Sequence, residues 1–342
     1  MACTAYVEND LVSCASIMNS PEYFDLRRSD LKLRRARRKG PRTCLYQGCT
    51  REAVRNHLLQ KNSVLTEFSK DSHIVELVVE DLPVVGWKFR ARRGINRAFT
   101  FKGLCPAHDN DLFRPIESGQ LDLQSQRAGV LLSYRALLNE IRKKEENVRW
   151  YDALLDDPTS RAEMQQWATW KRKCELVALN AMHGLRWQFE QWIRGRSYSG
   201  LAVHSRVVRR LPICCSSLFC KPAALAVDEI ETLLARGDGA IGPVQFVTIF
   251  PRGAQTYIVV GVPGMMSRSF VGETAVLVDG SEAEVVRKVS DMLLTGIEDW
   301  ACEPTWFEQI GSAGSELILN EKRSFLGAGR IGEAPSFNVF EL

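Results

Sequence analysis

The sequence predicts an α+β protein, and three observations predict it. Two Cys/His pairs surround a β-branched stretch within residues 44–117. Two long helical patterns follow, over 126–155 and 161–194. After residue 199 the chain changes to strand-like segments, many glycines and one further helical segment. We therefore expect an N-terminal Cys/His module, a long helical hairpin and a small mixed α/β domain.

Length and composition bound the class of protein. The chain has 342 residues, of which 45% are apolar and 25% charged. Those fractions are average for a globular protein and exclude wholesale disorder or a fibrous repeat. We expect four segments: a basic arm over 1–43, the Cys/His module over 44–120, the helical hairpin over 121–198 and the mixed α/β domain over 199–342.

Positive charge is concentrated at the N-terminal end. Residues 1–120 hold 20 Lys and Arg against 14 Asp and Glu, and nine of the sixteen residues from Arg27 to Arg42 are basic. Arg side chains suit phosphate groups, so we expect this end to contact nucleic acid, and DNA in particular. The alternative is a solvated lead-in that has no ligand. The candidate contacts are Arg34, Arg35, Arg37, Arg38 and Lys39, with a second cluster at Arg90, Arg92 and Arg93.

The sequence gives no indication of a membrane or secretory segment. No run of about 18 apolar residues occurs, and the N-terminus lacks a basic start followed by an apolar stretch. We therefore expect a cytoplasmic protein with no membrane partner. In a reducing compartment, closely spaced Cys and His are more often metal ligands or core residues than disulfides.

The two Cys/His pairs predict a zinc site. Four residues separate Cys44 from Cys49, and two separate Cys105 from His108. Pairs at such spacing, each on a tight turn, can present four ligands to one tetrahedral Zn²⁺ ion. The alternative is unrelated buried cysteines and a surface histidine. Between the pairs, residues 73–93 are rich in β-branched side chains and predict a hairpin or two short strands.

The two helical patterns predict an antiparallel hairpin. Apolar residues in the first recur at spacings of three and four, and the second carries an aromatic stripe. We interpret the stripe as core packing between the helices, the alternative being a ligand site. The residues expected to pack together are Trp167, Trp170, Phe189 and Trp192, against Leu131, Leu138 and Ile141.

The C-terminal part predicts strands over 244–250, 256–262 and 274–279 and a helix over 281–297. We expect much of the last thirty residues to be irregular. Its cysteines, Cys214, Cys215 and Cys220, are interpreted as core residues, because adjacent side chains of an extended chain point in opposite directions. A thiol nucleophile at Cys220 with His204 as its base stays open as an alternative.

The layout of the Cys/His module resembles the zinc-stabilised HNH, or ββα-metal, nucleases, which have a treble-clef arrangement. The resemblance covers residues 42–117 and rests on the two ligand pairs and on His57 in VRNHLLQKN. It implies that His57 is the general base and that Asp109 lies where the family has its last metal-binding residue. A catalytic Mg²⁺ or Mn²⁺ would lie near Asp109 and Asp111. The family usually has a carboxylate or His before its base, whereas this chain has Asn56.

A second resemblance covers residues 44–117. The segments HLLQK, FKGLCPAHDNDLF and PIE are similar to a module of uncharacterised bacterial proteins, some of them near mobile-element and anti-phage genes. It implies a role in bacterial antiviral defence.

Two functional hypotheses follow. The first is a zinc-containing nucleic-acid-binding protein with HNH-type endonuclease activity, in which His57 activates water and Asp109 helps to hold a divalent ion. The second is a non-catalytic zinc-stabilised protein whose helical hairpin and C-terminal domain bind protein partners.

Overall fold

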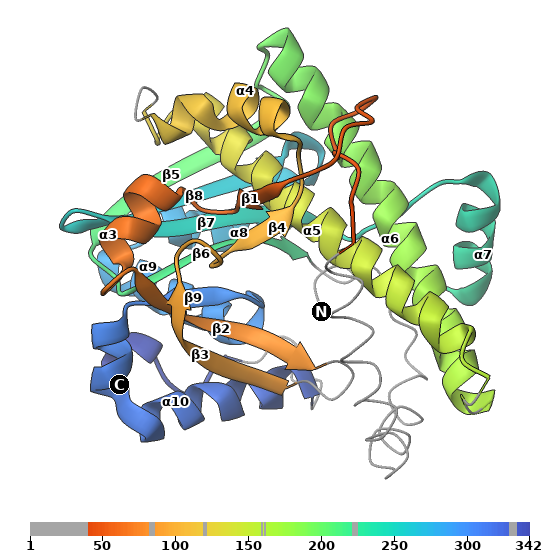
Figure 1. Ribbon diagram of the computed structural model, residues 1–342. Coiled ribbons are helices and arrows are strands. Elements are labelled where there is room, and N and C mark those ends of the chain that lie inside the picture. The colour runs from red at the N-terminus through yellow and green to blue at the C-terminus, as the bar shows by residue number, and fades with distance from the viewer. Residues whose placement is uncertain are drawn as a thin grey trace.

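The computed structural model describes residues 40–81, 86–118, 122–158, 160, 162–220, 225–327 and 334–342. A seven-stranded antiparallel sheet in the order β3-β2-β9-β6-β7-β8-β5 has helices on both faces (Figure 1). The predicted mixed α+β class is therefore confirmed. No helix in the described ranges is long and apolar enough to cross a membrane. Residues 1–39, which make up most of the predicted basic arm, lie outside the described residues.

The strands are β1 (Arg55–His57), β2 (His73–Asp81), β3 (Gly86–Gly94), β4 (Thr100–Lys102), β5 (Leu201–Arg209), β6 (Ile213–Cys220), β7 (Val244–Arg252), β8 (Gln255–Pro263) and β9 (Trp300–Cys302). The helices are η2 (Lys61–Leu65), α3 (Thr66–Phe68), α4 (Pro106–Glu117), α5 (Gln126–Leu155), α6 (Ala162–Gly195), α7 (Val227–Arg236), η3 (Gly264–Phe270), α8 (Val271–Asp279), α9 (Glu282–Thr295), α10 (Pro304–Gly327) and η4 (Val339–Glu341).

The predicted helical hairpin is present as α5 and α6 (Figure 1). Ser125 caps α5 by accepting a hydrogen bond from the backbone N–H of Ala128. Every residue of α5 from Ala128 to Leu138 is buried, because this helix contacts the sheet on one side and α6 and α4 on the others. A helix that is buried on all sides is central to its domain.

The predicted packing of the aromatic stripe is only partly right. Phe189 is fully buried, as are Leu131, Leu138 and Ile141. The three tryptophans are half-buried: Trp167, Trp170 and Trp192. Near the tip of the hairpin, away from the sheet, Trp167 packs edge-on against Trp150 of α5. Tryptophans at that end therefore meet neighbouring helices instead of the sheet core.

The C-terminal strands β7 and β8 form the predicted hairpin, but one other expectation is wrong and a second is only partly right. Residues 274–279 belong to helix α8, whose Leu277 packs into the core, not to a strand. The last thirty residues include most of α10, which bends at Gly311, where φ is 62°. Ile318 and Leu319 of α10 pack against the sheet, so burial of an apolar face stabilises a helix in a glycine-rich sequence.

Side chains of successive strand residues enter two different cores. Phe246 and Phe250 of β7 pack under α5, whereas Val247 and Ile249 pack under α8, α9 and α10. This alternation follows from the two-residue period of a strand. The sheet is therefore the middle layer of three.

The sheet joins strands from distant parts of the chain. The hairpin of β2 and β3 lies within the expected Cys/His module, yet β2 pairs with β9 of the C-terminal segment at Val75 and Cys302. The confirmed hairpin is thus an edge extension of the main sheet. The four-segment division stays a prediction about independent folding.

Candidate metal centre

The first ligand pair lies on a tight loop. The backbone N–H of Cys44 donates to the carbonyl of Arg51 at 2.8 Å, and that of Cys49 donates to the carbonyl of Tyr46 at 3.0 Å. Gly48 has a φ of 76°, a conformation that favours glycine. The loop therefore returns on itself and brings the Cys49 thiol back toward that of Cys44.

The second pair lies at the N-terminal end of α4. Cys105 is the residue before the helix and Pro106 is the first residue in it, a position where proline is favoured. His108 follows Cys105 by three residues and so lies on the same side of the first turn. The helix start therefore places a thiol and an imidazole side by side.

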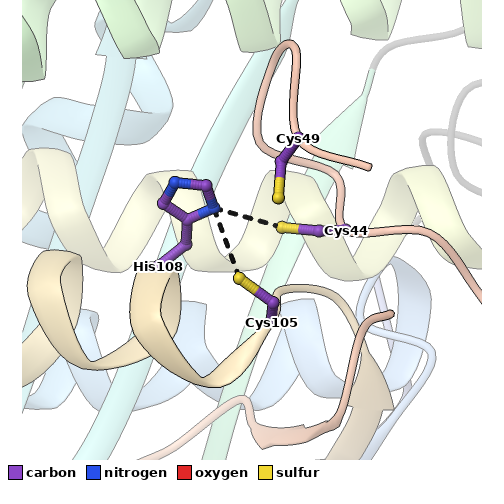
Figure 2. A group of neighbouring side chains, drawn as sticks. All are labelled: Cys44, Cys49, Cys105 and His108. Atoms are coloured by element: carbon purple, nitrogen blue, oxygen red, sulfur yellow. Dashed lines mark hydrogen bonds between the residues drawn. The ribbon is translucent and has the colours of Figure 1, made fainter. Parts of the chain in front are cut away.

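The four predicted ligands converge on one point (Figure 2). Their ligand atoms all lie within 4.8 Å of one another, and His108 Nδ1 is 3.4 Å from Cys44 Sγ and 3.5 Å from Cys105 Sγ. A tetrahedral zinc site with ordinary bond lengths has edges of about 3.5–3.8 Å. Cys44, Cys49 and Cys105 form no disulfide. The cluster could therefore hold a metal ion.

The surroundings affect the ligands differently. Burial lowers the pKa of His108, which keeps its imidazole neutral and able to bind a cation. Burial raises the pKa of the Cys44 thiol to about 11, whereas a hydrogen bond from the backbone N–H of Arg51 lowers the pKa of Cys49. A cation would stabilise the thiolate form of both.

Helix α6 holds the first loop in place. The carboxylate of Glu190, which is fully buried, accepts from the backbone N–H of Gln47 at 3.2 and 3.3 Å and from the Tyr134 hydroxyl at 2.9 Å. Arg186 donates to the carbonyl of Leu45 at 2.7 Å. Burial raises the pKa of Glu190, and these donors oppose that rise. The helical hairpin is therefore part of the support for the metal centre.

Asn56 has a structural task. Its side-chain oxygen accepts from the backbone N–H groups of Gly103 at 3.0 Å and Leu104 at 2.6 Å, directly before Cys105. The residue is 2% exposed. The amide thus fixes the chain that leads into the second ligand pair, and its oxygen is already used by two donors.

His57 lies at the end of β1, half-buried and outside the Cys/His cluster. Its Nε2 donates to the carbonyl oxygen of Ile95 at 3.0 Å, since a carbonyl can only accept. Burial lowers the pKa of His57, so the neutral imidazole with an unprotonated Nδ1 is favoured.

Asp109 is in the first turn of α4, one residue after His108. Its Oδ1 is buried and has no hydrogen-bond partner in the part of the chain that the structure describes. Burial raises the pKa of Asp109, whereas the charge of Arg135, the side-chain amide of Asn56 and the charge of His57 oppose the rise, which places these three groups near the carboxylate. Asp111 is exposed.

The basic candidates are not gathered at this centre. Arg34, Arg35, Arg37, Arg38 and Lys39 lie outside the described residues. On β3, Arg93 forms an ion pair with Glu76 at 3.2 Å, and Arg92 is exposed with a φ of 59°. Arg90 is half-buried. Their predicted contact with nucleic acid stays a prediction.

The C-terminal cysteines do not form a second centre. Cys214 packs into the core under α5 and Cys215 into the core on the opposite face of the sheet. Strands β7 and β8 separate Cys220 on β6 from His204 on β5, so the two cannot act as nucleophile and base. Among the described residues, one Cys/His cluster is close enough to hold a metal.

Two residues at the centre were missed from the sequence. Arg135 and Glu190 both lie in the buried interface between α5 and neighbouring helices, where the periodic pattern suggested apolar packing only. The available signal was a charge inside an apolar run, as in GVLLSYRALL. Comparisons of the sequence and structure with known protein families, curated proteins and solved structures found no match.

Proposed function

We propose that this protein is a zinc-stabilised nucleic-acid-binding protein with an HNH-type endonuclease centre at His57 and Asp109. The observation that carries the proposal is the position of Asp109, which directly follows the candidate zinc ligand His108 and lies within electrostatic range of His57. A structural zinc site needs four protein ligands, so His57 and Asp109 are left for other chemistry.

The order of elements supports a treble-clef arrangement. The loop with Cys44 and Cys49 comes first, the β1–β4 ladder pairs Arg55 with Lys102, and α4 then begins at the second ligand pair. The residues between β1 and β4, which include the β2–β3 hairpin, are an insertion into this arrangement. A β-ladder followed by a helix is what the resemblance to ββα-metal nucleases implies.

The resembled nucleases would hold a divalent ion through residues at the positions of Asn56 and Asp109. Only Asp109 has a side chain that fits this role. Asp109 has a buried carboxylate oxygen without a hydrogen-bond partner in the described chain, and carboxylate oxygen is a ligand that Mg²⁺ and Mn²⁺ prefer. The Asn56 oxygen does not fit, because it accepts two backbone hydrogen bonds. When bound, such an ion would stabilise the charge on the leaving oxygen.

His57 supplies the general base. The hydrogen bond to Ile95 fixes the ring and leaves Nδ1 to take a proton from water. The water oxygen forms a bond to phosphorus, the bond to the leaving oxygen breaks, and solvent protonates that oxygen. Because burial holds the pKa of His57 below 6.5, the base form persists to lower pH, and activity should fall only below about pH 6.

Plasmid nicking by purified protein in Mg²⁺ and in Mn²⁺ tests this proposal. His57→Ala should abolish nicking, and Asp109→Asn should abolish or strongly reduce it, with zinc content and fold unchanged. The matched control is His204→Ala, a half-buried histidine of β5 that lies in the seven-stranded sheet and not in the β1–β4 ladder. Absence of nicking by the wild-type protein in both metals between pH 6 and 9 would contradict the proposal.

The second candidate function is a non-catalytic zinc-stabilised interaction protein. Two observations favour it: the Asn56 side chain and the His57 ring both hydrogen-bond to backbone, as purely structural residues would. In α6, Trp187 is 49% exposed, which offers a contact for a protein partner. Under this function His57→Ala lowers the melting temperature or zinc content, and no nicking occurs.

The biological setting proposed from the second resemblance is bacterial antiviral defence. Plaque assays of cells that express the wild-type protein or His57→Ala would test it. Equal plaque numbers with and without the protein would contradict it.

A further inference from the structure

Arg135 is a buried cation with an incomplete set of partners. It lies on α5 and is 1% exposed. One of its terminal nitrogens, Nη2, donates to Glu117 at 2.6 Å, which is its one hydrogen bond within the described chain, and Nε is buried with no partner there. An arginine has five N–H donors, so most of its donor capacity is unused.

The guanidinium of Arg135 lies along one face of α4. Asp109, Phe113 and Glu117 follow one another at intervals of four residues and therefore share that face. Arg135 lies over the Phe113 ring at 3.9 Å from its centroid and pairs with Glu117. The next residue along the same face is Asp109, whose buried Oδ1 also has no hydrogen-bond partner in the described ranges.

His57 approaches the same region from β1. Burial lowers the pKa of His57, and the positive charges of Lys61 and Arg135 act in the same direction. Asp109 begins the α4 face that Arg135 covers, about two turns before its partner Glu117. An imidazole, a carboxylate and a guanidinium from three elements therefore lie within electrostatic range of one another.

This arrangement is costly for a purely structural residue. A buried charge destabilises a protein unless it is paired and hydrogen-bonded. Among the described residues Arg135 forms an ion pair with Glu117, whose side chain is itself 40% exposed. Apolar side chains would connect α5 to α4 at lower cost. The buried Nε, which has no partner within the described chain, instead fits an anionic ligand at the α4 face that Asp109 begins.

We infer that Arg135 is the anion-binding residue of the His57–Asp109 centre and that it receives an oxygen of a phosphate group. The planar donor fork of arginine suits phosphate, and Phe113 and Glu117 hold the guanidinium in position. The identification of the phosphate as that of a nucleic-acid backbone rests on the proposed function. The anion site itself does not depend on catalysis.

Inorganic phosphate is the probe for the anion site. In thermal unfolding at constant ionic strength, replacing chloride by phosphate should raise the melting temperature of the wild-type protein, because a ligand of the folded state stabilises it. Arg135→Gln should lose this response. The control is Arg127→Gln, which removes the same charge from an exposed position on α5 and should keep the response.

Binding of a fluorescein-labelled DNA duplex without added divalent ions is the second measurement. Loss of one charge-assisted contact should weaken binding by Arg135→Gln about tenfold or more, and the loss by Arg127→Gln should be smaller. Arg135→Lys keeps the charge but not the fork, and it should recover part of both responses. If Arg135→Gln does not fold, Arg135→Lys decides alone.

The outcomes separate this inference from the proposed function. Arg135-dependent phosphate binding without nicking by the wild-type protein would overturn the nuclease proposal and keep the anion site. Nicking that requires His57 but is unchanged in Arg135→Gln would overturn the anion site. A folded Arg135→Gln, or Arg135→Lys, with the full phosphate response would also overturn it.

Discussion

The two faces of the seven-stranded sheet bury different chemistry. Under α8, α9 and α10 the core is aliphatic and aromatic, and Lys322 is the one charged residue among those buried in these helices. The opposite face, under α5 and α6, buries many charged side chains: Arg135, Glu140, Arg142, Lys144, Glu175 and Glu190. Apolar burial stabilises a fold at lower cost than charge burial. The buried charges are therefore concentrated in the helical layer that also supports the candidate metal centre.

Removal of the candidate metal ligand Cys105 should have the largest effect, and it is the strongest test of the difference between the two faces. Structural zinc contributes about 10 kcal/mol or more to folding in small modules, and Cys105 is fully buried at the start of α4. We expect Cys105→Ser to lose zinc and most of its solubility. Elemental analysis and thermal unfolding measure the two effects.

The matched control lies on the apolar face. Cys215 is also fully buried but has no metal partner. Cys215→Ala should keep one zinc ion per chain and lower stability only modestly. If Cys105→Ser kept its metal and melting temperature, the Cys/His cluster would be a packing feature and the two faces would not differ in this respect.

Much of the fold could be predicted because its signals are local. The two long helices and the strands of the β7–β8 hairpin follow from periodicity, and the four candidate metal ligands follow from paired spacing. The prediction of a strand over 274–279 was wrong, because a short β-branched run is compatible with a strand or a helix. The packing of Leu277 into the core decides for the helix.

The rest of the candidate site depends on contacts between distant residues. Glu190 meets the loop at Gln47 across 143 positions, and Asn56 meets Leu104 across 48. Asn56 stands where the resembled nucleases usually have a metal-holding carboxylate or His, but in this chain its side-chain oxygen accepts hydrogen bonds from the backbone of Gly103 and Leu104. The spacing of residues along the sequence predicts which side chains lie close together within one turn. It does not predict which helix packs against a given loop.

Truncation of Asn56 should have the second-largest effect. Asn56→Ala leaves the N–H groups of Gly103 and Leu104 without an acceptor, and each buried unsatisfied donor costs about 1–3 kcal/mol. Because these donors lie next to Cys105, zinc affinity should fall together with stability. Competition with a chromogenic chelator and denaturant unfolding measure the two quantities.

A buried asparagine on the other face supplies the comparison. Asn338 accepts a hydrogen bond from the backbone N–H of Phe340 at 3.2 Å beside α9. Asn338→Ala should lower stability without changing zinc affinity. Equal zinc affinities for Asn56→Ala and the wild-type protein would show that the second ligand pair does not need this amide.

Lys322 gives the smallest expected effect and tests the one exception on the apolar face. Its Nζ donates to the carbonyls of Leu293 and Ile297 at 2.7 Å each, at the end of α9, and burial lowers its pKa to about 7. The unfolded chain keeps the ordinary pKa near 10.5. Between these values the unfolded state binds a proton that the folded state does not bind, so stability should rise with pH.

The expected slope is at most about 1.4 kcal/mol per pH unit, and it should be absent in Lys322→Met. Denaturant unfolding of the zinc-loaded proteins at pH 7.5 and 8.5 measures this slope. Subtracting the slope of the variant from that of the wild-type protein removes the contribution of other titrating groups. The exposed Lys70→Met is the control and should keep the wild-type slope. If the wild-type protein and Lys322→Met showed the same change of stability with pH, Lys322 would stay charged in the folded state, stabilised by the nearby Glu298 and Asp299. The apolar face would then also bury a paired charge, and the contrast between the two faces would rest on the metal centre alone.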